Sequence, residues 1–437
     1  MRDDVGGLAA RLGFADTAAV LAASERYWNP DKTRFWSQAG VPLVVGRREG
    51  YHLYDLAGRA FLDVHLNGGT YNLGHRNPEL VAALIAGLDE VDIGNHHFPS
   101  VARAALAREL VRLAPPGTAD GGAKVIYASG GGEAIDIALK TTRHATGRTR
   151  IVSVVKAYHG HTGLAVCTGD DRFSELFRSA RPDEFPHVPF NDLDAMAAAL
   201  APGDVAAVIM ETIPATYGFP LPEPGYLETV KRLCEQHGTL YIADEVQTGL
   251  MRTGELWGIT KHGIAPDLLV TGKGLSGGLY PIAAVVVADA AAGWLREDGF
   301  GHMSTFGGAE LGCLVALAVL EITTRTTTRA NVAARAGQVA AGLADVRAAN
   351  PGWFTGVRQN GLVLGLEFDH PQGARAVMRE LYERGVWAIF STLDPRVLQY
   401  KPGVLMTAEL TDDLLERTAD AIEAAGRTVA APSAAAR

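Results

Sequence analysis

Lys273 and Asp244 have the types and the spacing of a residue pair that carries amine chemistry. Lys273 lies in T-G-K-G-L-S-G-G, directly after the apolar run D-L-L-V, and Asp244 ends another apolar run 29 residues earlier. A lysine so placed can form a Schiff base with the aldehyde of pyridoxal phosphate, and a carboxylate can pair with the protonated ring nitrogen of that cofactor. The pair predicts a pyridoxal-phosphate site in which both residues are catalytic.

Lys273 does not fit the other common role of a lysine in a glycine-rich loop, which is to bind nucleotide phosphates. A P-loop requires a glycine at position 267 and a serine or threonine at position 274. The sequence has Asp267 and Gly274 there.

A phosphate group would find a binding site in S-G-G-G-E-A, residues 129–134, which follow an apolar run and open a helical pattern. Free N–H groups at a helix N-terminus favour an anion, so this segment is predicted to bind the cofactor phosphate. The segment lacks the spacing of a dinucleotide site because the third glycine position is Ile135.

An aromatic side chain to cover the flat pyridine ring is available in A-Y-H-G-H-T, where either Tyr158 or His159 could stack on it. His159 and His161 also raise the possibility of a metal ion. Their i, i+2 spacing in a glycine-containing loop, without a third ligand motif nearby, predicts no metal site.

The bulk composition is that of a large globular enzyme. The chain has 437 residues, of which 47% are hydrophobic and 20% charged, and its net charge of −9 argues against a nucleic-acid partner. Its three scattered cysteines favour a reducing compartment without disulfides. The start, M-R-D-D-V-G-G-L, contains no apolar signal core, and no apolar run reaches 18 residues. We therefore expect a cytoplasmic protein without a membrane partner.

Strand-like and helix-like segments alternate between residues 120 and 290, which predicts an α/β fold with a mostly parallel sheet flanked by helices. The expected strands are K-V-I-Y-A, R-I-V-S-V-V, D-V-A-A-V-I-M, T-L-Y-I-A, D-L-L-V-T and P-I-A-A-V-V-V-A. Ligands of such sheets bind beyond the carboxyl ends of the strands, where Asp244 and Lys273 both fall.

The two ends of the chain predict a second, smaller α/β domain. Residues 41–65 alternate like an antiparallel hairpin, residues 330–349 and 411–425 are alanine-rich and helical, and G-L-V-L-G-L-E-F and V-L-Q-Y are typical of strands. The expected division is an N-terminal segment of the small domain at 1–70, a large cofactor domain at 71–325, and the rest of the small domain at 326–430.

Motifs in this order and spacing, from about residue 40 to 425, resemble the class III (omega-) aminotransferase family, which has fold type I of the pyridoxal-phosphate enzymes. D-E-V-Q-T-G-L-M-R-T-G-E-L-W is similar to the family's signature. The resemblance implies that Asp244 binds the pyridine nitrogen, that Gln247 contacts the ring's 3-oxygen, and that Lys273 forms the Schiff base. Glu211, in V-I-M-E-T, matches an active-site glutamate.

Three further segments extend the resemblance. G-G-E-A matches the phosphate loop at Gly131 and Gly132, and Y-H-G-H-T places Tyr158 on the stacking position. S-T-F-G-G matches the segment whose threonine, here Thr305, reaches the cofactor phosphate of the neighbouring subunit. The resemblance therefore implies a homodimer with shared active sites, a small-molecule amino donor and a carbonyl acceptor.

The sequence departs from the family where many members bind a substrate carboxylate with an arginine in R-F-x-P-P-L. This chain has V-L-Q-Y-K-P-G-V-L, with Gln399 at the arginine position. A neutral amide cannot form the bidentate, charge-assisted clamp. We expect one substrate to lack a carboxylate there, as an ω-amine or amino sugar of secondary metabolism would. Arg396 or Lys401 replacing the arginine is the open alternative.

Two other functions need the same residues. An aminomutase or epimerase on this fold would also use Lys273 and Asp244, and only the requirement for an amino donor separates it from an aminotransferase. A non-catalytic protein that binds pyridoxal phosphate is the alternative outside the enzymes. The joint presence of Lys273, Asp244, Gln247 and Thr305 favours the aminotransferase.

Overall fold

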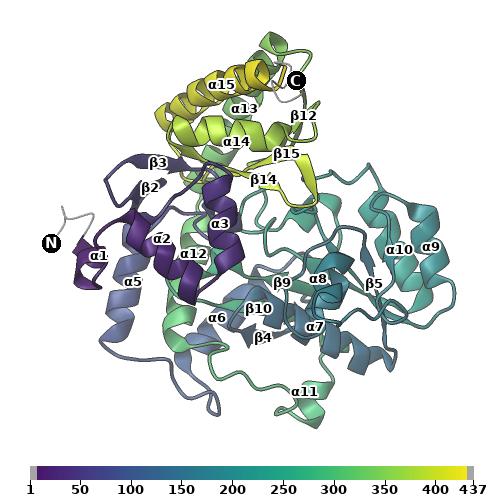
Figure 1. Ribbon diagram of the computed structural model, residues 1–437. Helices are drawn as coiled ribbons and strands as arrows, with labels where there is room; N and C mark the ends of the chain where they lie inside the picture. Colours follow the sequence, from purple (N-terminus) through teal and green to yellow (C-terminus); the bar gives the residue numbers. More distant parts are fainter. Residues whose placement is uncertain (1–6, 431–437) are drawn as a thin grey trace.

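The computed structural model describes residues 7–430, so residues 1–6 and 431–437, including the start of the predicted N-terminal segment, lie outside it. A large α/β body carries a smaller body made of the C-terminal helices and two small sheets (Figure 1).

The large body is built on a seven-stranded sheet. Its strands, in order across the sheet, are β4 (Lys124–Ala128), β10 (Ala283–Val287), β9 (Leu268–Thr271), β8 (Leu240–Asp244), β7 (Val205–Glu211), β5 (Arg150–Val154) and β6 (His187–Val188). β10 runs antiparallel to both of its neighbours, and the remaining pairs are parallel. The predicted, mostly parallel sheet is confirmed, and the short β6 is an addition to it.

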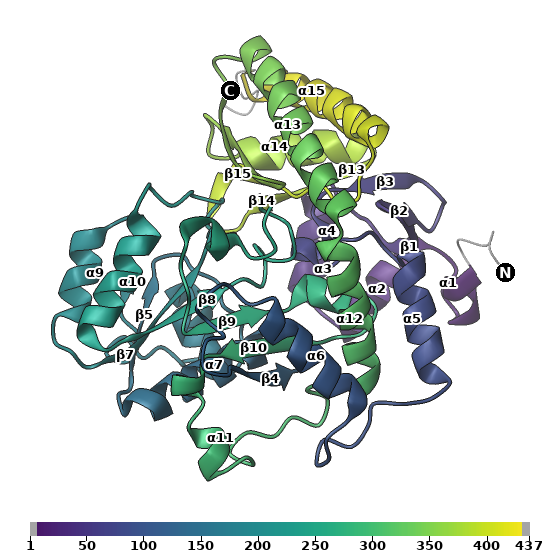
Figure 2. The ribbon, with the colours of Figure 1, turned by 180° about the vertical axis from the view of Figure 1, so that it is seen from behind.

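Helices cover both faces of this sheet, which explains why its central strands are continuously apolar. One face packs on α7 (Gly131–Thr146) through Ile151, Ile209 and Ile242. The alternate residues of the same strands face the other side. That side is covered by α6 (Val101–Arg112), α9 (Leu193–Leu200), α10 (Tyr226–His237) and α12 (Glu310–Thr324). α7 is seen in Figure 1, and α6 and α12 in the reverse view of Figure 2.

The smaller body contains two four-stranded sheets. The first has the order β1 (Val45–Glu49), β2 (His52–Asp55), β3 (Ala60–Asp63), β13 (Val386–Trp387), and the second β11 (Phe354–Asn360), β12 (Val363–Phe368), β15 (Asp394–Tyr400), β14 (Ile389–Ser391). The helices packed on them are α13 (Thr326–Ala349), α14 (Gly373–Glu383) and α15 (Ala408–Ala430).

Both chain ends build this body, because β13 pairs in parallel with β3. The hairpin predicted within residues 41–65 is a three-stranded meander instead. The predicted turn at 55–58 joins β2 to β3, and a second turn at Gly50, which has a φ of +56°, joins β1 to β2. The division after residues 70 and 325 stays a prediction.

Short elements complete the fold. They are α1 (Gly7–Arg11), α2 (Thr17–Tyr27), α3 (Pro30–Gln38), α4 (Leu66–Gly69), α5 (Pro78–Leu88), α8 (Asp171–Glu175) and α11 (Trp294–Glu297), with the 3₁₀ turns η1 (Ala165–Thr168), η2 (Gly258–His262), η3 (Lys273–Ser276) and η4 (Asp289–Ala291). α3 docks on the smaller body, where the rings of Trp36 and Trp387 meet edge to face at 5.3 Å.

Across residues 7–430, no single helix is both long and apolar enough to cross a membrane. α12 and α13 reach that length and apolarity only together, and they are bent by 62° at their junction. The same range contains no group of three or more His, Cys, Asp or Glu side chains placed to hold a metal ion.

Candidate active site

A cavity of about 300 Å³ opens where β7, β8 and β9 end and α7 begins. It is lined by Asn67, Thr70, Gly131, Gly132, Ile135, Tyr158, His159, Gly160, Glu211, Asp244, Val246, Gln247 and Lys273. Every site residue predicted from the sequence lies here except Thr305. The parallel strands explain this convergence, because their carboxyl ends share one edge of the sheet.

Lys273 follows the end of β9 and begins η3 with a φ of +41°. A non-glycine residue in this left-handed region is strained, a cost that sites of function commonly tolerate. Gly68 leaves room for the side chain, since a Cβ there would lie 2.9 Å from Lys273 Cε. Burial lowers the pKa of the Lys273 amine below its ordinary value, although the charges of Asp244 and Glu211 oppose this shift. A lowered amine pKa suits both a nucleophile and a base.

Asp244 is held rigidly at the end of β8. Its Oδ2 accepts a hydrogen bond from His159 Nδ1 at 2.7 Å, and its Oδ1 accepts one from the backbone N–H of Val246 at 3.0 Å. His159 and Asp244 are both buried. The sequence left His159 open as a stacking ring, whereas the structure places it as a hydrogen-bond donor to this carboxylate. The contact with His159 fixes the orientation of the carboxylate that would pair with a cationic ring nitrogen.

Glu211 ends β7 beside Asp244 in the next strand. Its two carboxyl oxygens accept hydrogen bonds from the backbone N–H groups of Tyr158, at 3.2 Å, and Ala215, at 3.0 Å. Burial, assisted by the charge of Asp244, raises the pKa of Glu211 to about 7. The protonation state of Glu211 is therefore sensitive to a change in the charge bound in this cavity.

The start of α7 is a suitable cradle for a phosphate. Its N-cap, Gly130, makes no side-chain capping bond. Within residues 7–430 no acceptor is bonded to the N–H groups of Gly131 and Gly132. The cradle is tight, because a Cβ at Gly132 would lie 2.8 Å from Thr162 Oγ1. Free amides at a helix N-terminus fit the phosphate of pyridoxal phosphate.

Two further side chains fit the ring of the cofactor. The Oε1 atom of Gln247 is buried without a hydrogen-bond partner in the described chain, so it is available to accept a hydrogen bond from a ligand hydroxyl. Tyr158 lies at the cavity wall, half-buried, with its ring edge-on to Phe173 at 5.8 Å. Together with Lys273 and Asp244, these groups match the aldehyde, the ring nitrogen, the 3-oxygen and the ring face of pyridoxal phosphate.

Thr305 does not line this cavity. It is exposed, in the loop between α11 and α12, and the nearby side chains of Met303 and Phe306 are exposed as well. Its predicted role concerns the neighbouring subunit, and the position within one chain does not test that role.

Sequence reasoning missed Asn67 and Thr70, which line the cavity from the segment L-N-G-G-T. Asn67 and Gly68 have φ values of +48° and +72°, so the chain turns back here against Lys273. The glycine pair next to Asn67 was the available signal, because adjacent glycines mark a close backbone approach.

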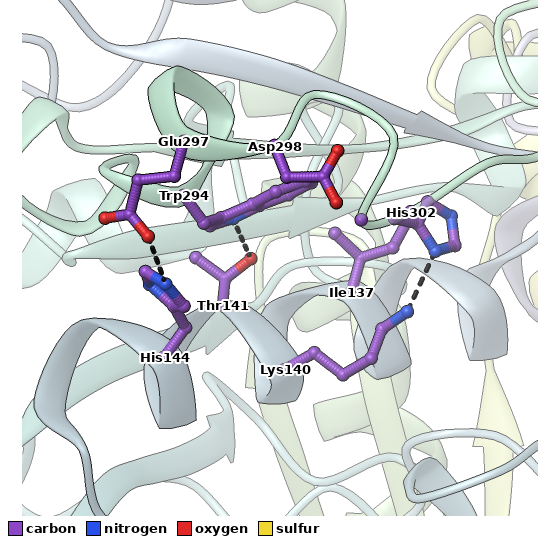
Figure 3. Close-up of a pocket in the computed structure, with 9 residues that line it drawn as sticks. Ile137, Lys140, Thr141, His144, Trp294, Glu297, Asp298 and His302 are labelled. Carbon is purple, nitrogen blue, oxygen red and sulfur yellow. Dashed lines mark hydrogen bonds and ion pairs between the residues drawn. The ribbon is translucent and has the colours of Figure 1, made fainter.

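A second cavity of about 240 Å³ lies on the outer side of α7, against α11 (Figure 3). Three pairs of its side chains are bonded to each other. Lys140 contacts His302 at 2.9 Å, His144 contacts Glu297 at 3.1 Å, and the indole N–H of Trp294 donates to Thr141. It includes no predicted site residue, so the chemistry is assigned to the first cavity.

The structure distinguishes the two possible replacements for the missing arginine. Arg396 is exposed and bonded to Asp394, with Nε 3.2 Å from Oδ1. Lys401 is buried, and its Nζ donates to Oε1 of Gln399 at 2.6 Å. The charges of Lys273 and Glu211 both act on Lys401, so it belongs to the surroundings of the cavity.

Known proteins match this fold and sequence. The pattern of the family described as "Aminotransferase class-III" covers residues 36–422. An uncharacterized aminotransferase of Archaeoglobus fulgidus is 40% identical over 421 residues, which are 96% of this chain and 97% of the relative.

Solved structures of aminotransferases have a similar fold. The ornithine aminotransferase of Toxoplasma gondii superposes with a TM-score of 0.88 at 24% identity, over 98% of this chain and 100% of that one. The N-acetylornithine aminotransferase of Stenotrophomonas maltophilia has a TM-score of 0.74 at 28% identity, over 90% and 98%.

The match over most of the chain, together with the convergence of a lysine, a carboxylate and a phosphate cradle on one cavity, leads to one assignment. This chain belongs to the class III aminotransferase family and is a pyridoxal-phosphate-dependent aminotransferase of fold type I.

Proposed function

We propose that this enzyme transfers an amino group between an amine or amino-acid donor and an aldehyde, ketone or keto-acid acceptor through a Schiff base on Lys273. The observation that carries the proposal is the placement of Lys273 and Asp244 beyond the ends of the neighbouring parallel strands β9 and β8, facing one cavity. When bound, pyridoxal phosphate supplies an electron-accepting ring that stabilises negative charge on the substrate carbon.

The residues of the chain supply the remaining steps. Asp244, oriented by His159, keeps the ring nitrogen protonated. Gly131 and Gly132 bind the phosphate, Tyr158 stacks on the ring face, and Gln247 contacts the 3-oxygen. With pyridoxal phosphate and substrate bound, the free Nζ of Lys273 would be the base that takes up and returns the proton of the substrate carbon. Burial lowers the pKa of this amine, which favours the unprotonated form that can accept a proton.

The missing arginine bears on the substrates. Gln399 cannot clamp a carboxylate, and Arg396 is bonded to Asp394 on the surface. We infer that one substrate is an amine without a carboxylate at this place, such as an ω-amine or an amino sugar of secondary metabolism. Its reaction partner is an amino acid or keto acid that other groups hold.

A two-substrate assay tests the function. The loaded enzyme is incubated with ω-amines and amino sugars, each with and without pyruvate, and both products are quantified. We expect alanine and the matching carbonyl compound in equal amounts, and neither without pyruvate. Isomerisation of one compound without an acceptor would instead establish a mutase or epimerase. A loaded enzyme inert toward every amine would refute the proposal.

The active unit is proposed to be a homodimer in which Thr305 completes the phosphate site of the partner. Support comes from its exposure in a loop with exposed apolar neighbours, Met303 at 58% and Phe306 at 55%, which a second subunit would cover. Sedimentation should give a dimer, and Thr305→Ala should weaken cofactor binding about tenfold, as expected for a lost hydrogen bond to a charged group. A fully active monomer would contradict this arrangement.

A further inference from the structure

Lys401 is a buried amine without an anionic partner. Its side chain is 1% exposed, and its Nζ donates one hydrogen bond, to Oε1 of Gln399. The same Nζ lies 5.0 Å from the centroid of the Phe219 ring. Within residues 7–430 no carboxylate lies within 4.0 Å of it. Burial lowers the pKa of the Lys401 amine well below its ordinary value. A bound anion would supply the opposite charge that favours the ammonium form of this amine.

The carboxylates whose charges reach Lys401 are already committed elsewhere. Asp63 bonds His75 Nε2 at 2.9 Å through Oδ2, and its Oδ1 caps the backbone of the following turn. Both oxygens of Glu211 accept backbone N–H groups. Next to burial, the charge of Arg252 lowers the pKa of the Lys401 amine most. The surroundings of Lys401 therefore attract an anion.

Gln399 and Phe219, which lie next to the Lys401 amine, have defined positions. Gln399 lies in β15, two residues before Lys401, and its Nε2 forms no hydrogen bond within the described chain. Phe219 holds a φ of +55°, a strained value for an aromatic residue. Its position is secured by Gly218, whose carbonyl accepts from Arg358 at 2.9 Å. Such strain commonly marks a functional site.

We propose that Lys401, with the free amide N–H of Gln399, binds the carboxylate of the amino acid or keto acid that supplies or removes the amino group. The inference rests on the proposed function and names the group that holds its carboxylate-bearing substrate. A single ammonium and an amide replace the bidentate arginine, so the carboxylate is held by separate donors on β15. The other substrate, an amine, does not need this pair.

The test compares two probes of equal size, propionate and propanamide, titrated calorimetrically into the cofactor-loaded enzyme. We expect propionate to bind at least about tenfold more tightly, as for a charge-assisted hydrogen bond. Lys401→Met should abolish this preference, and Lys401→Arg, which keeps the charge, should retain most of it. Arg396→Met is the matched control, because it removes an exposed cation three strand positions before Gln399 and should leave the preference unchanged.

The outcomes separate the two proposals. Equal binding of both probes by the unmodified enzyme, or a preserved preference in Lys401→Met, would overturn the carboxylate site. Cofactor absorbance of each variant verifies that it is folded and loaded. If the Lys401→Met variant does not bind the cofactor, the same comparison of propionate with propanamide is made with Lys401→Gln and the unmodified enzyme. A propionate preference without transfer from any amine would leave the carboxylate site standing and refute the aminotransferase function instead.

Discussion

Lys273→Ala is expected to lower turnover by at least about 10³-fold, because it removes both the covalent attachment of the cofactor and the base that moves the proton. The visible absorption band of the lysine-bound cofactor should disappear as well. Spectra of the loaded variant and a single-turnover measurement with an accepted amine check both effects. Added methylamine should restore part of the rate, since a small amine fits where the side chain was removed.

Lys140→Ala is the control for this prediction. Lys140 is an exposed lysine of the second cavity, and its only bonded side chain there is His302. Turnover of this variant should equal that of the unmodified enzyme. If Lys273→Ala remained active while Lys140→Ala lost activity, the reaction site would lie on the outer side of α7.

Asp244→Asn should reduce turnover by at least about 10²-fold, as for the loss of a preorganised electrostatic contact at a reacting group. The substitution keeps the shape of the side chain and removes the charge that holds the ring nitrogen protonated. Fold stability should fall by roughly 1–3 kcal/mol, because an amide keeps one acceptor oxygen and can accept from only one of the two donors, His159 and the Val246 N–H. Steady-state kinetics and thermal unfolding of the loaded enzyme measure the two effects.

The adjacent carboxylate offers a matched comparison. Glu245 is buried but lies outside the cavity, where it accepts bonds from the backbone N–H groups of Gly258 and Ile259, at 2.8 Å each, and from Thr248. Glu245→Gln should lower stability by roughly 1–3 kcal/mol, the cost of a buried group left unpaired, with turnover per folded molecule within a few-fold. A fully active Asp244→Asn variant would remove Asp244 from the ring.

The strands of the large domain could be predicted from the sequence because they are buried on both faces. Continuous apolar runs such as R-I-V-S-V identified β5 and its neighbours, and their shared carboxyl edge followed from parallel pairing. The three-stranded meander was harder to predict, because its third strand is only four residues long and needs β13 from the far end of the chain. α1 to α3 were also not anticipated, and α3 docks through aromatic contacts such as that of Trp36 with Trp387, which is far away in the sequence.

The site shows the same contrast between local and distant contacts. Strand-end residues such as Asp244 and Lys273 could be placed from their own segments. The bond between His159 and Asp244 joins residues 85 positions apart, and no local pattern indicates it. The burial of Lys401 depends on Phe219 and Gln399, which come from different bodies of the fold. The burial of Lys401 could therefore not be deduced from its neighbours in the sequence.

The parallel pairing of β3 with β13 also sets an order of events during synthesis. β3 ends at residue 63 and its partner begins at residue 386, roughly 320 residues later. At about 5–20 residues per second, the ribosome delivers β13 roughly 15 to 65 s after β3. During that interval every strand of the seven-stranded sheet is completed, while one edge of β3 has no strand beside it. Unpaired edges are templates for association between chains, so during this interval the edge of β3 is open to pairing with a strand of another chain.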